Sequence, residues 1–288
     1  MYRSLLLIPG NRLEILDKPG SSQADAVVID VQGDKANADV KKALSTVSKR
    51  GQHVFARINP LATGRTRLDL DSALVGPELT GICVDRVESS HDIYDYGSII
   101  KELEEKMGLP IGHTRIIASL DTPRAVIRTF EICGASPRIT GAAFNTDAFL
   151  ASMGIRASDA VSKASNAASA VILAALASDV SVFDFTGGEG DSIARLDTEA
   201  KKAKQMGFSG KLTSRPDYVE TLNRAFTPST EEVKLAHKAI AAFVEGERKG
   251  QSAIYFDGEL VDIAVVRRYR KLLTLADFIS KRSTQQNP

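Results

Sequence analysis

Tryptophan is absent from this 288-residue sequence, and cysteine and histidine are scarce, with two and four residues. Cys83 and Cys133 lie far apart in apolar surroundings, which is typical of reduced core thiols rather than of a disulfide framework. The sequence also lacks any apolar run long enough to span a bilayer, and its formal net charge is only +1. We therefore expect neither nucleic acid nor a membrane as a partner.

The first residues enter a strand pattern almost at once, which leaves no room for a signal or transit peptide. The composition, with 43% hydrophobic and 25% charged residues, is ordinary for a soluble globular protein. We expect a cytoplasmic protein that acts on a small molecule.

Short apolar runs alternate with helical patterns along most of the chain. The runs are almost continuously apolar, which is typical of strands buried on both faces of a parallel sheet. Eight such strands close a (β/α)8 TIM barrel at about this length, and an open doubly wound sheet is the alternative. The predicted strands are Ser4–Ile8, Ala26–Asp30, His53–Ile58, Gly81–Val84, Arg115–Leu120, Gly141–Phe144, Val180–Phe185 and Lys211–Thr213. The predicted helices between them include Asn37–Lys49, His91–Met107, Pro123–Ile132, Ser158–Ala177 and Asp191–Gln205.

Residues 1–228 are predicted to form the barrel, and residues 229–288 a C-terminal extension. The extension contains a helical pattern at Thr230–Glu247, a short run at Ala253–Phe256, the segment DGELVD and a basic helical pattern at Ile263–Lys281. A barrel needs none of these elements. We therefore expect the extension to cover a barrel mouth, either its own or that of a neighbouring subunit.

Polar residues follow nearly every predicted strand. In a parallel α/β protein the carboxyl ends of the strands meet at one rim, where barrel active sites are built. Asp121 and Asp147 follow the fifth and sixth strands, so both carboxylates could face one ion. Two hard oxygen ligands without a nearby His or Cys favour Mg²⁺ over Zn²⁺. The other groups predicted at this rim are Pro9-Gly10-Asn11-Arg12, Asp30, Arg57-Ile58-Asn59-Pro60, Asp85-Arg86, Asp184 and Thr213-Ser214-Arg215-Pro216.

Two kinds of chemistry are not expected at this rim. None of the histidines follows a strand, which argues against a His-based triad or a His-ligated zinc site. Lysine is missing from the ends of the middle strands, which argues against an aldolase that forms a Schiff base.

The candidate residues also have purely structural interpretations. Asp121 precedes Thr122-Pro123, where either Asp or Thr could be the N-cap of a helix with Pro at its first position. Asp147 and Asp262 also precede helical patterns, so either could be a cap. Arg57 could brace the Asn59-Pro60 turn that follows it. The glycine cluster at residues 187–190 could cradle a phosphate or form an ordinary loop.

A series of short segments resembles the citrate lyase beta chain, malyl-CoA lyase and citramalyl-CoA lyase group of magnesium-dependent carbon–carbon lyases. In order they are RSLLLIPGNR, ADAVVID, ARINP, VES, LDTPRAV, AAFNTD, MGFSGKLTSRP, AFTPSTEEV and DGELVDIAVVRR. The resemblance covers nearly the whole chain. It implies a TIM barrel that is often assembled as a trimer, with the C-terminal segment reaching toward a neighbouring subunit's site.

The resemblance also implies roles for particular residues. The family's metal-binding Glu falls on Asp121, and its metal-binding Asp falls on Asp147. Its arginine at the end of the third strand falls on Arg57, and its acid/base Asp falls on Asp262. The positions implied near the CoA thioester are Pro9, Gly10, Arg12, Arg215 and Pro216.

Several rim positions depart from the family pattern. Its acidic segment after the second strand is Val31-Gln32-Gly33 here, so negative charge is lost behind the metal site. The metal Glu is shortened by one methylene to Asp121. These changes indicate a divergent substrate or a weakened enzyme. The remaining departures are Asp85-Arg86 for Pro-Lys, Thr146 for Glu, and Thr213-Ser214-Arg215-Pro216 for Cys-Ile-His-Pro.

Three functions are compatible with these residues. The first is a magnesium-dependent lyase that cleaves a 3-hydroxyacyl-CoA, such as a citryl-, malyl- or citramalyl-CoA-like substrate, by a retro-aldol or retro-Claisen step. Mg²⁺ on the two aspartates would chelate the keto-acid fragment, Arg57 would stabilise the enolate or clamp a carboxylate, and Asp262 would move the proton. The second is a CoA-binding or regulatory relative without catalysis. The third is an aldolase for free keto acids whose carboxylate Arg215 binds.

Overall fold

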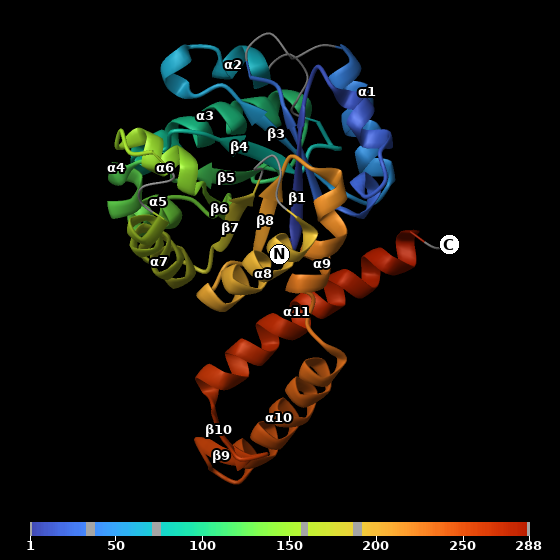
Figure 1. Ribbon diagram of the computed structural model, residues 1–288, viewed down its shortest axis with the longest axis vertical. Helices are drawn as coiled ribbons and strands as arrows, with labels where there is room; N and C mark the ends of the chain where they lie inside the picture. The colour runs from blue at the N-terminus through green and yellow to red at the C-terminus, as the bar shows by residue number, and fades with distance from the viewer. Residues whose placement is uncertain (1, 33–37, 71–75, 157–160, 187–191, 287–288) are drawn as a thin grey trace. The chain divides into compact units, whose positions relative to one another are not determined.

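The computed structural model describes residues 2–32, 38–70, 76–156, 161–186 and 192–286. Within them, the predicted strands form a closed eight-stranded barrel in chain order, and β8 closes on β1 (Figure 1). All the strand pairs of this barrel are parallel. The predicted TIM barrel is therefore confirmed, and the open sheet is excluded. The strands are β1 Ser4–Pro9, β2 Ala26–Asp30, β3 His53–Ile58, β4 Gly81–Val84, β5 Arg115–Ser119, β6 Ile139–Phe144, β7 Ser181–Thr186 and β8 Gly210–Thr213.

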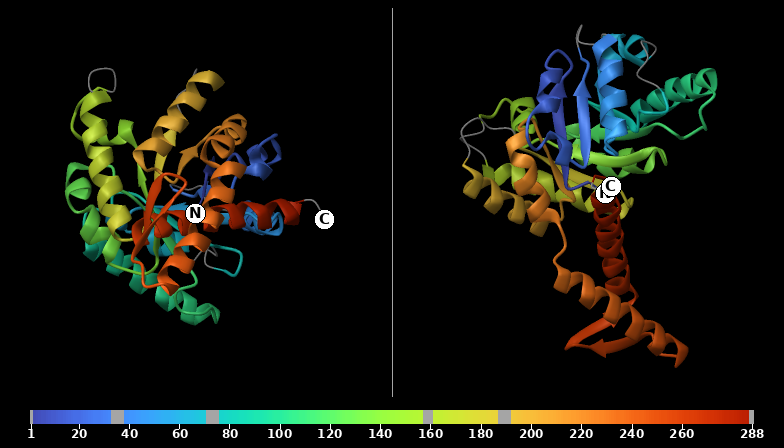
Figure 2. Two further views of the ribbon diagram at one scale, coloured as in Figure 1. Left: turned by 90° about the horizontal axis from the view of Figure 1, so that it is seen from below. Right: turned by 90° about the vertical axis from the view of Figure 1, so that its right-hand side faces the viewer.

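Helices cover the outside of the barrel (Figure 2). The α-helices are α1 Ala38–Lys49, α2 Thr66–Asp69, α3 Ser90–Met107, α4 Pro123–Ile127, α5 Thr129–Gly134, α6 Thr146–Ser152, α7 Val161–Ala177, α8 Ile193–Met206 and α9 Val219–Phe226. Short 3-10 helices occupy Leu13–Asp17, Ser21–Gln23, Leu61–Thr63 and Pro216–Tyr218. The predicted helix starts at Asn37, Ser158 and Asp191 lie outside the described residues.

The single helix predicted over Pro123–Ile132 is wrong in one respect, because the structure divides it into α4 and α5. The break lies at Arg128, whose φ and ψ of −99° and 11° depart from helical values. Next to it, the Thr129 hydroxyl donates to the carbonyls of Ala125 and Val126, each at 3.0 Å. A threonine that bonds back to the preceding turn bends a helix, which explains the division.

The strands are buried on both faces, as their apolar character predicts. All five residues of β2 are buried. Val27 and Ile29 belong to the large core cluster that also includes helix residues. Because side chains alternate along a strand, Val28 and Asp30 point to the opposite face, into the barrel. The same alternation decides which residues of the other strands reach the barrel mouth.

The chain divides into two compact units, Tyr2–Phe226 and Thr227–Pro288. The second unit contains the predicted helices α10 (Thr230–Arg248) and α11 (Ile263–Gln286) and an antiparallel hairpin of β9 (Ala253–Phe256) and β10 (Glu259–Asp262). Asp257 and Gly258 turn the hairpin with φ of 51° and 80°, the left-handed values that a tight two-residue turn requires. The packing of this unit on a barrel mouth stays a prediction.

None of the helices in the described ranges combines the length and the apolar character that a membrane span requires.

A buried ion pair fastens α3 to the amino ends of β5 and β6. The Glu104 carboxylate accepts from Arg138 Nη1 and Nη2 at 2.8 and 2.7 Å and from the backbone N–H groups of Gly112 and Thr114. Burial raises the pKa of Glu104, but the hydrogen bonds from Arg138, Thr114 and Gly112 outweigh it and lower the pKa to about 2. The pair therefore stabilises the folded protein only while Glu104 is ionised.

Glu104→Gln should remove a pH-dependent part of the stability. The folded-state pKa lies below the unfolded value, so the contribution is complete above about pH 5 and is lost as the pH falls through 2. Above about pH 5, this contribution to the free energy of unfolding is of the order of 3 kcal/mol. Urea unfolding at a series of pH values should show a steeper acid decline for the wild type than for the variant. The exposed neighbour Glu105 provides the control, Glu105→Gln, and identical pH slopes for wild type and Glu104→Gln would contradict the assignment.

Candidate functional site

The barrel mouth contains a paired arginine and aspartate from adjacent strands. Arg57 lies on β3, and its Nε and Nη2 both donate to Asp85 Oδ2 at 2.9 and 2.6 Å. Its Nη1 lies 3.9 Å from Asp30 Oδ2, at the end of β2. The Arg57 side chain is 32% exposed and the Asp85 side chain 15%, so the pair is partly desolvated. A charged hydrogen bond in such a place is stronger than one at the surface.

Asp85 joins the ends of four neighbouring strands. Besides the two bonds from Arg57, its Oδ2 accepts from Gln32 Nε2 at 2.8 Å, and its Oδ1 accepts from the Ser119 hydroxyl at 3.1 Å. Gln32 Nε2 also donates to the carbonyl of Ile58 at 3.0 Å, which fixes the amide orientation. Side chains that follow or end β2, β3, β4 and β5 thus converge on one carboxylate. Asp85 is therefore held in one orientation from several directions.

Asp121 lies just beyond β5, and its carboxylate contacts the end of β6. Its Oδ1 accepts from the backbone N–H of Asn145 at 2.9 Å. Burial raises the pKa of Asp121 to about 7; the Asn145 hydrogen bond opposes this, the Asp85 charge adds to it, and Arg57 opposes it. The alternative that Asp121 caps the next helix is wrong, because the Thr122 hydroxyl accepts the Ala125 N–H and is the N-cap of α4.

Asp147 lies in the first turn of α6 and is exposed. It is not the cap of that helix, because Asn145 Oδ1 accepts the N–H groups of Asp147 and Ala148 at 3.0 and 3.2 Å. Asn145 therefore contacts both candidate ligands: its backbone N–H binds the Asp121 carboxylate, and its side chain binds the Asp147 backbone. Asp121 and the Asp147 backbone are thus linked through one residue, at the ends of two adjacent strands.

The donor set of these two aspartates fits Mg²⁺. Among the described residues, no three His, Cys, Asp or Glu side chains gather into a metal cluster, so any ion here would have few protein ligands. Magnesium in proteins is commonly held by one or two carboxylates, with water and substrate oxygens completing its octahedron. A structural zinc site would require four ligands and is not indicated.

The residues predicted near CoA have mixed surroundings. The Gly10 N–H donates to the Asp30 carbonyl at 2.8 Å, which joins the Pro9-Gly10 turn to β2. Arg12 is exposed and pairs with Glu14 at 3.3 Å. Arg215 pairs with Asp217 at 2.5 Å and lies 4.3 Å from the centre of the Tyr218 ring. Pro216 begins the 3-10 helix after β8.

Three features singled out in the sequence cannot be placed at the mouth. Gly33 and the glycine cluster at residues 187–190 lie outside the described residues. Asp262 belongs to the second unit, where its Oδ1 accepts the N–H groups of Ala264 and Val265 at 2.9 and 3.0 Å. Of the three aspartates with a possible capping role, Asp262 is the one whose side chain caps its helix. One carboxylate oxygen is used in this way, so an acid/base role for Asp262 stays a prediction.

Sequence reasoning missed the central position of Asp85. Asp85 was predicted at the rim as one of several strand-end residues without a role of its own, Gln32 appeared only as a departure from a family pattern, and Ser119 was assigned to a strand interior. The signal that could have found them is strand register: Arg57 lies beside Cys83, so Asp85, two residues further on, projects from the same face of the sheet.

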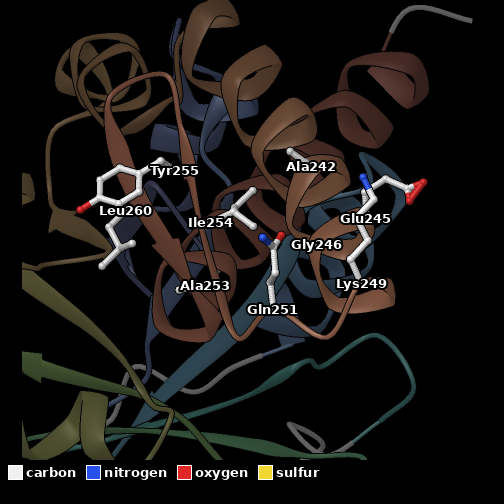
Figure 3. Close-up of a pocket in the computed structure, with 9 residues that line it drawn as sticks. All are labelled: Ala242, Glu245, Gly246, Lys249, Gln251, Ala253, Ile254, Tyr255 and Leu260. Atoms are coloured by element: carbon white, nitrogen blue, oxygen red, sulfur yellow. The ribbon is translucent and has the colours of Figure 1, made fainter.

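A pocket of about 510 Å³ also opens in the C-terminal unit, between α10 and the β9–β10 hairpin (Figure 3). Tyr255 and Leu260 lie on one side of it, and Glu245 and Lys249 on the other. All its lining residues come from this unit, and the predicted site residues are not among them.

A closed parallel barrel that presents carboxylates and an arginine at the carboxyl ends of its strands has the architecture of a TIM-barrel enzyme. The model of the HpcH/HpaI aldolase/citrate lyase family matches residues 3–216, and the chain belongs to this family of carbon–carbon lyases. The resemblance recognised in the sequence is thereby confirmed.

Curated relatives match almost end to end. The citrate lyase subunit beta of Leuconostoc mesenteroides subsp. cremoris is 27% identical over 284 residues, which cover 96% of this chain and 94% of that protein. A (3S)-malyl-CoA thioesterase of Cereibacter sphaeroides (strain ATCC 17029 / ATH 2.4.9) is 27% identical over 286 residues, covering 97% and 96%.

Solved structures share the fold. The protein CitE from Mycobacterium tuberculosis, in complex with magnesium, acetoacetate and coenzyme A, matches with a TM-score of 0.66 and 24% identity, covering 95% of this chain and 97% of that one. A citrate lyase from Burkholderia xenovorans LB400 matches with a TM-score of 0.73 and 14% identity, covering 100% and 97%.

Asn145→Ala should destabilise the start of α6. The substitution removes the side-chain oxygen that accepts two backbone N–H groups, which typically costs about 1 kcal/mol. Asn145→Ser keeps a capping oxygen and should retain most of the stability. Urea unfolding of both variants beside the wild type measures the difference, and equal losses for Ala and Ser would show that the cap contributes little.

Proposed function

We propose that this protein is a magnesium-dependent carbon–carbon lyase that cleaves a 3-hydroxyacyl-CoA, of the citryl-, malyl- or citramalyl-CoA type, by a retro-aldol or retro-Claisen reaction. The observation that carries the proposal is the position of Asp121 and Asp147. They follow adjacent strands, they are linked through Asn145, and the first of them is electrostatically coupled to Arg57. Membership of the family supports the reaction class.

In this proposal Asp121 and Asp147 hold the Mg²⁺ ion. Magnesium accompanies acetoacetate and coenzyme A in the M. tuberculosis protein CitE, which supports the same cofactor and a CoA substrate here. When bound, the ion acts as a Lewis acid that stabilises negative charge on the oxygen of the reacting carbon. The side chain of Asp121 is one methylene shorter than the family's Glu, and its carboxylate accepts the Asn145 N–H just after β6.

The reaction breaks the bond between the hydroxyl-bearing carbon and the α-carbon of the thioester. The hydroxyl proton passes to water, the hydroxyl-bearing carbon becomes the carbonyl carbon of a 2-oxo acid, and the electron pair of the broken C–C bond forms a thioester enolate. That enolate gains a proton at its α-carbon. We assign this proton transfer to Asp262, and to Arg57 the task of donating hydrogen bonds to the enolate oxygen or to a substrate carboxylate.

The remaining assignments concern CoA binding and the assembly. The CoA portion of the substrate would contact Pro9, Gly10, Arg12, Arg215 and Pro216. A cytoplasmic homotrimer, in which Asp262 comes from a neighbouring subunit, would bring the acid/base group to each site.

A catalytically silent relative is the second candidate, because one observation favours it. The charge of Arg57 is already compensated by Asp85, so the arginine has less positive charge to offer an enolate. A relative of this kind would bind CoA or an acid without turnover. Calorimetric titration with Mg²⁺ and assay of malyl-, citramalyl- and citryl-CoA separate the two candidates, since only the lyase requires both metal binding and cleavage.

Asp147→Ala should abolish Mg²⁺-dependent cleavage and leave the fold intact, because Asp147 is exposed in the first turn of α6 and does not cap it. Isothermal titration with Mg²⁺ should show the loss of binding, and circular dichroism should be unchanged. Asp95→Ala, at an exposed carboxylate on α3, serves as the control and should bind Mg²⁺ normally. Unchanged turnover in Asp147→Ala would remove the metal-site assignment.

A further inference from the structure

The guanidinium of Arg57 is engaged before any substrate arrives. Of the five N–H groups of an arginine side chain, two are directed at Asp85 Oδ2, from Nε and Nη2. Asp30 Oδ2 lies 3.9 Å from Nη1 and adds a second negative charge on the other side. Arg57 can still donate hydrogen bonds through Nη1, but its positive charge faces two carboxylates of the protein itself.

Asp85 is built into this position and does not swing freely. Gln32 and Ser119 each donate a hydrogen bond to it, in addition to the two from Arg57. These four donor groups belong to three residues of the rim: Gln32 after β2, Arg57 near the end of β3, and Ser119 at the end of β5. A ligand that drew Arg57 away from Asp85 would leave a partly buried carboxylate without its counter-charge, which is costly.

This arrangement limits how many negative charges a substrate can bring. A 2-oxo acid presents one carboxylate beside its carbonyl, and these two groups can complete the coordination of a divalent ion with one oxygen each. A second carboxylate on the same fragment would need a further cation. The other described arginines of the rim do not replace Arg57: Arg12 is paired with Glu14, Arg215 is paired with Asp217, and Arg86 is exposed to solvent. A second carboxylate that approached Arg57 would therefore be desolvated beside Asp30 and Asp85.

We propose that Asp85 is a specificity-determining residue that restricts the site to substrates releasing a 2-oxo monocarboxylate, such as malyl- and citramalyl-type thioesters, and excludes citryl-type thioesters, which release a dicarboxylate. This inference rests on the proposed lyase function and narrows its substrate class. It also distinguishes the acyl groups in the names of two relatives that are each 27% identical to this chain, a citrate lyase subunit and a (3S)-malyl-CoA thioesterase.

The test compares two 2-oxo acids that differ by one carboxylate, pyruvate and oxaloacetate. Both are titrated into the full-length protein at saturating Mg²⁺, and the ratio of their dissociation constants is measured for the wild type and for Asp85→Asn. The wild type should favour pyruvate by about tenfold or more. Asn keeps the shape of Asp but removes its charge, so the ratio should shift toward oxaloacetate by about tenfold.

Two further variants make the result specific. Glu88→Gln removes a negative charge three residues away, where Glu88 pairs with Arg124 and not with Arg57, and should leave the ratio unchanged. Asp85→Ser, which retains a hydrogen-bond acceptor, should shift the ratio in the same direction as Asp85→Asn and provides a second measurement if Asn impairs folding. Circular dichroism establishes that each variant is folded.

The outcomes distinguish this inference from the proposed function. A wild type that binds oxaloacetate as well as pyruvate, or an Asp85→Asn variant that weakens both acids equally, overturns the specificity role and leaves the lyase function in place. A wild type that binds neither acid in the presence of Mg²⁺ overturns the proposed function and this inference together.

Discussion

The site depends on the two-residue period of side chains along parallel strands. Residues of one parity pack against the helices, as Val27 and Ile29 do, and residues of the other parity point into the barrel. The strands are hydrogen-bonded in a fixed register, with Asp30 beside Arg57 and Arg57 beside Cys83, so inward residues near successive strand ends come close together at the mouth. This geometry assembles a polar cluster from segments that are distant in the sequence. The apolar face of the same strands supplies the burial that holds the cluster in place.

The electrostatics of the mouth follow from how far each group is removed from water. Asp85 is surrounded by donors, whereas Asp121 accepts one backbone N–H and is otherwise desolvated, so burial raises the pKa of Asp121 to about 7. The two carboxylates are also coupled, because the charge of Asp85 raises the pKa of Asp121 and the charge of Arg57 lowers it. A substitution at Asp85 therefore affects the arginine and the candidate metal ligand together, which is why the specificity test relies on a ratio of affinities.

Much of the fold could be predicted, because it depends on local patterns, and the same patterns give the candidate site its predicted position. Continuous apolar runs identified the eight strands, and the rule for parallel sheets placed Arg57, Asp121 and Asp147 at one rim. The residue that caps each helix N-terminus could not be predicted, because two neighbouring side chains compete for the same role. Thr122 caps α4 rather than Asp121, and Asn145 caps α6 rather than Asp147. The outcome depends on which side chain can reach the first N–H groups of the helix. The central role of Asp85 depends on strand register, which no local pattern gives.

The departures at Gln32 and Asp85 acquire a common explanation from their contact. From the sequence alone, the neutral residue after the second strand suggested a loss of negative charge and a weakened site. In the structure, the Gln32 amide donates to Asp85 Oδ2 at 2.8 Å, so an acidic side chain at Gln32 would place two carboxylates within hydrogen-bonding distance. Two like charges at that distance cannot both stay ionised. The acid at the end of β4 therefore requires a neutral donor after β2. The two changes together place a negative charge beside Arg57, and the specificity role that we propose for Asp85 explains both changes by one rearrangement of the mouth.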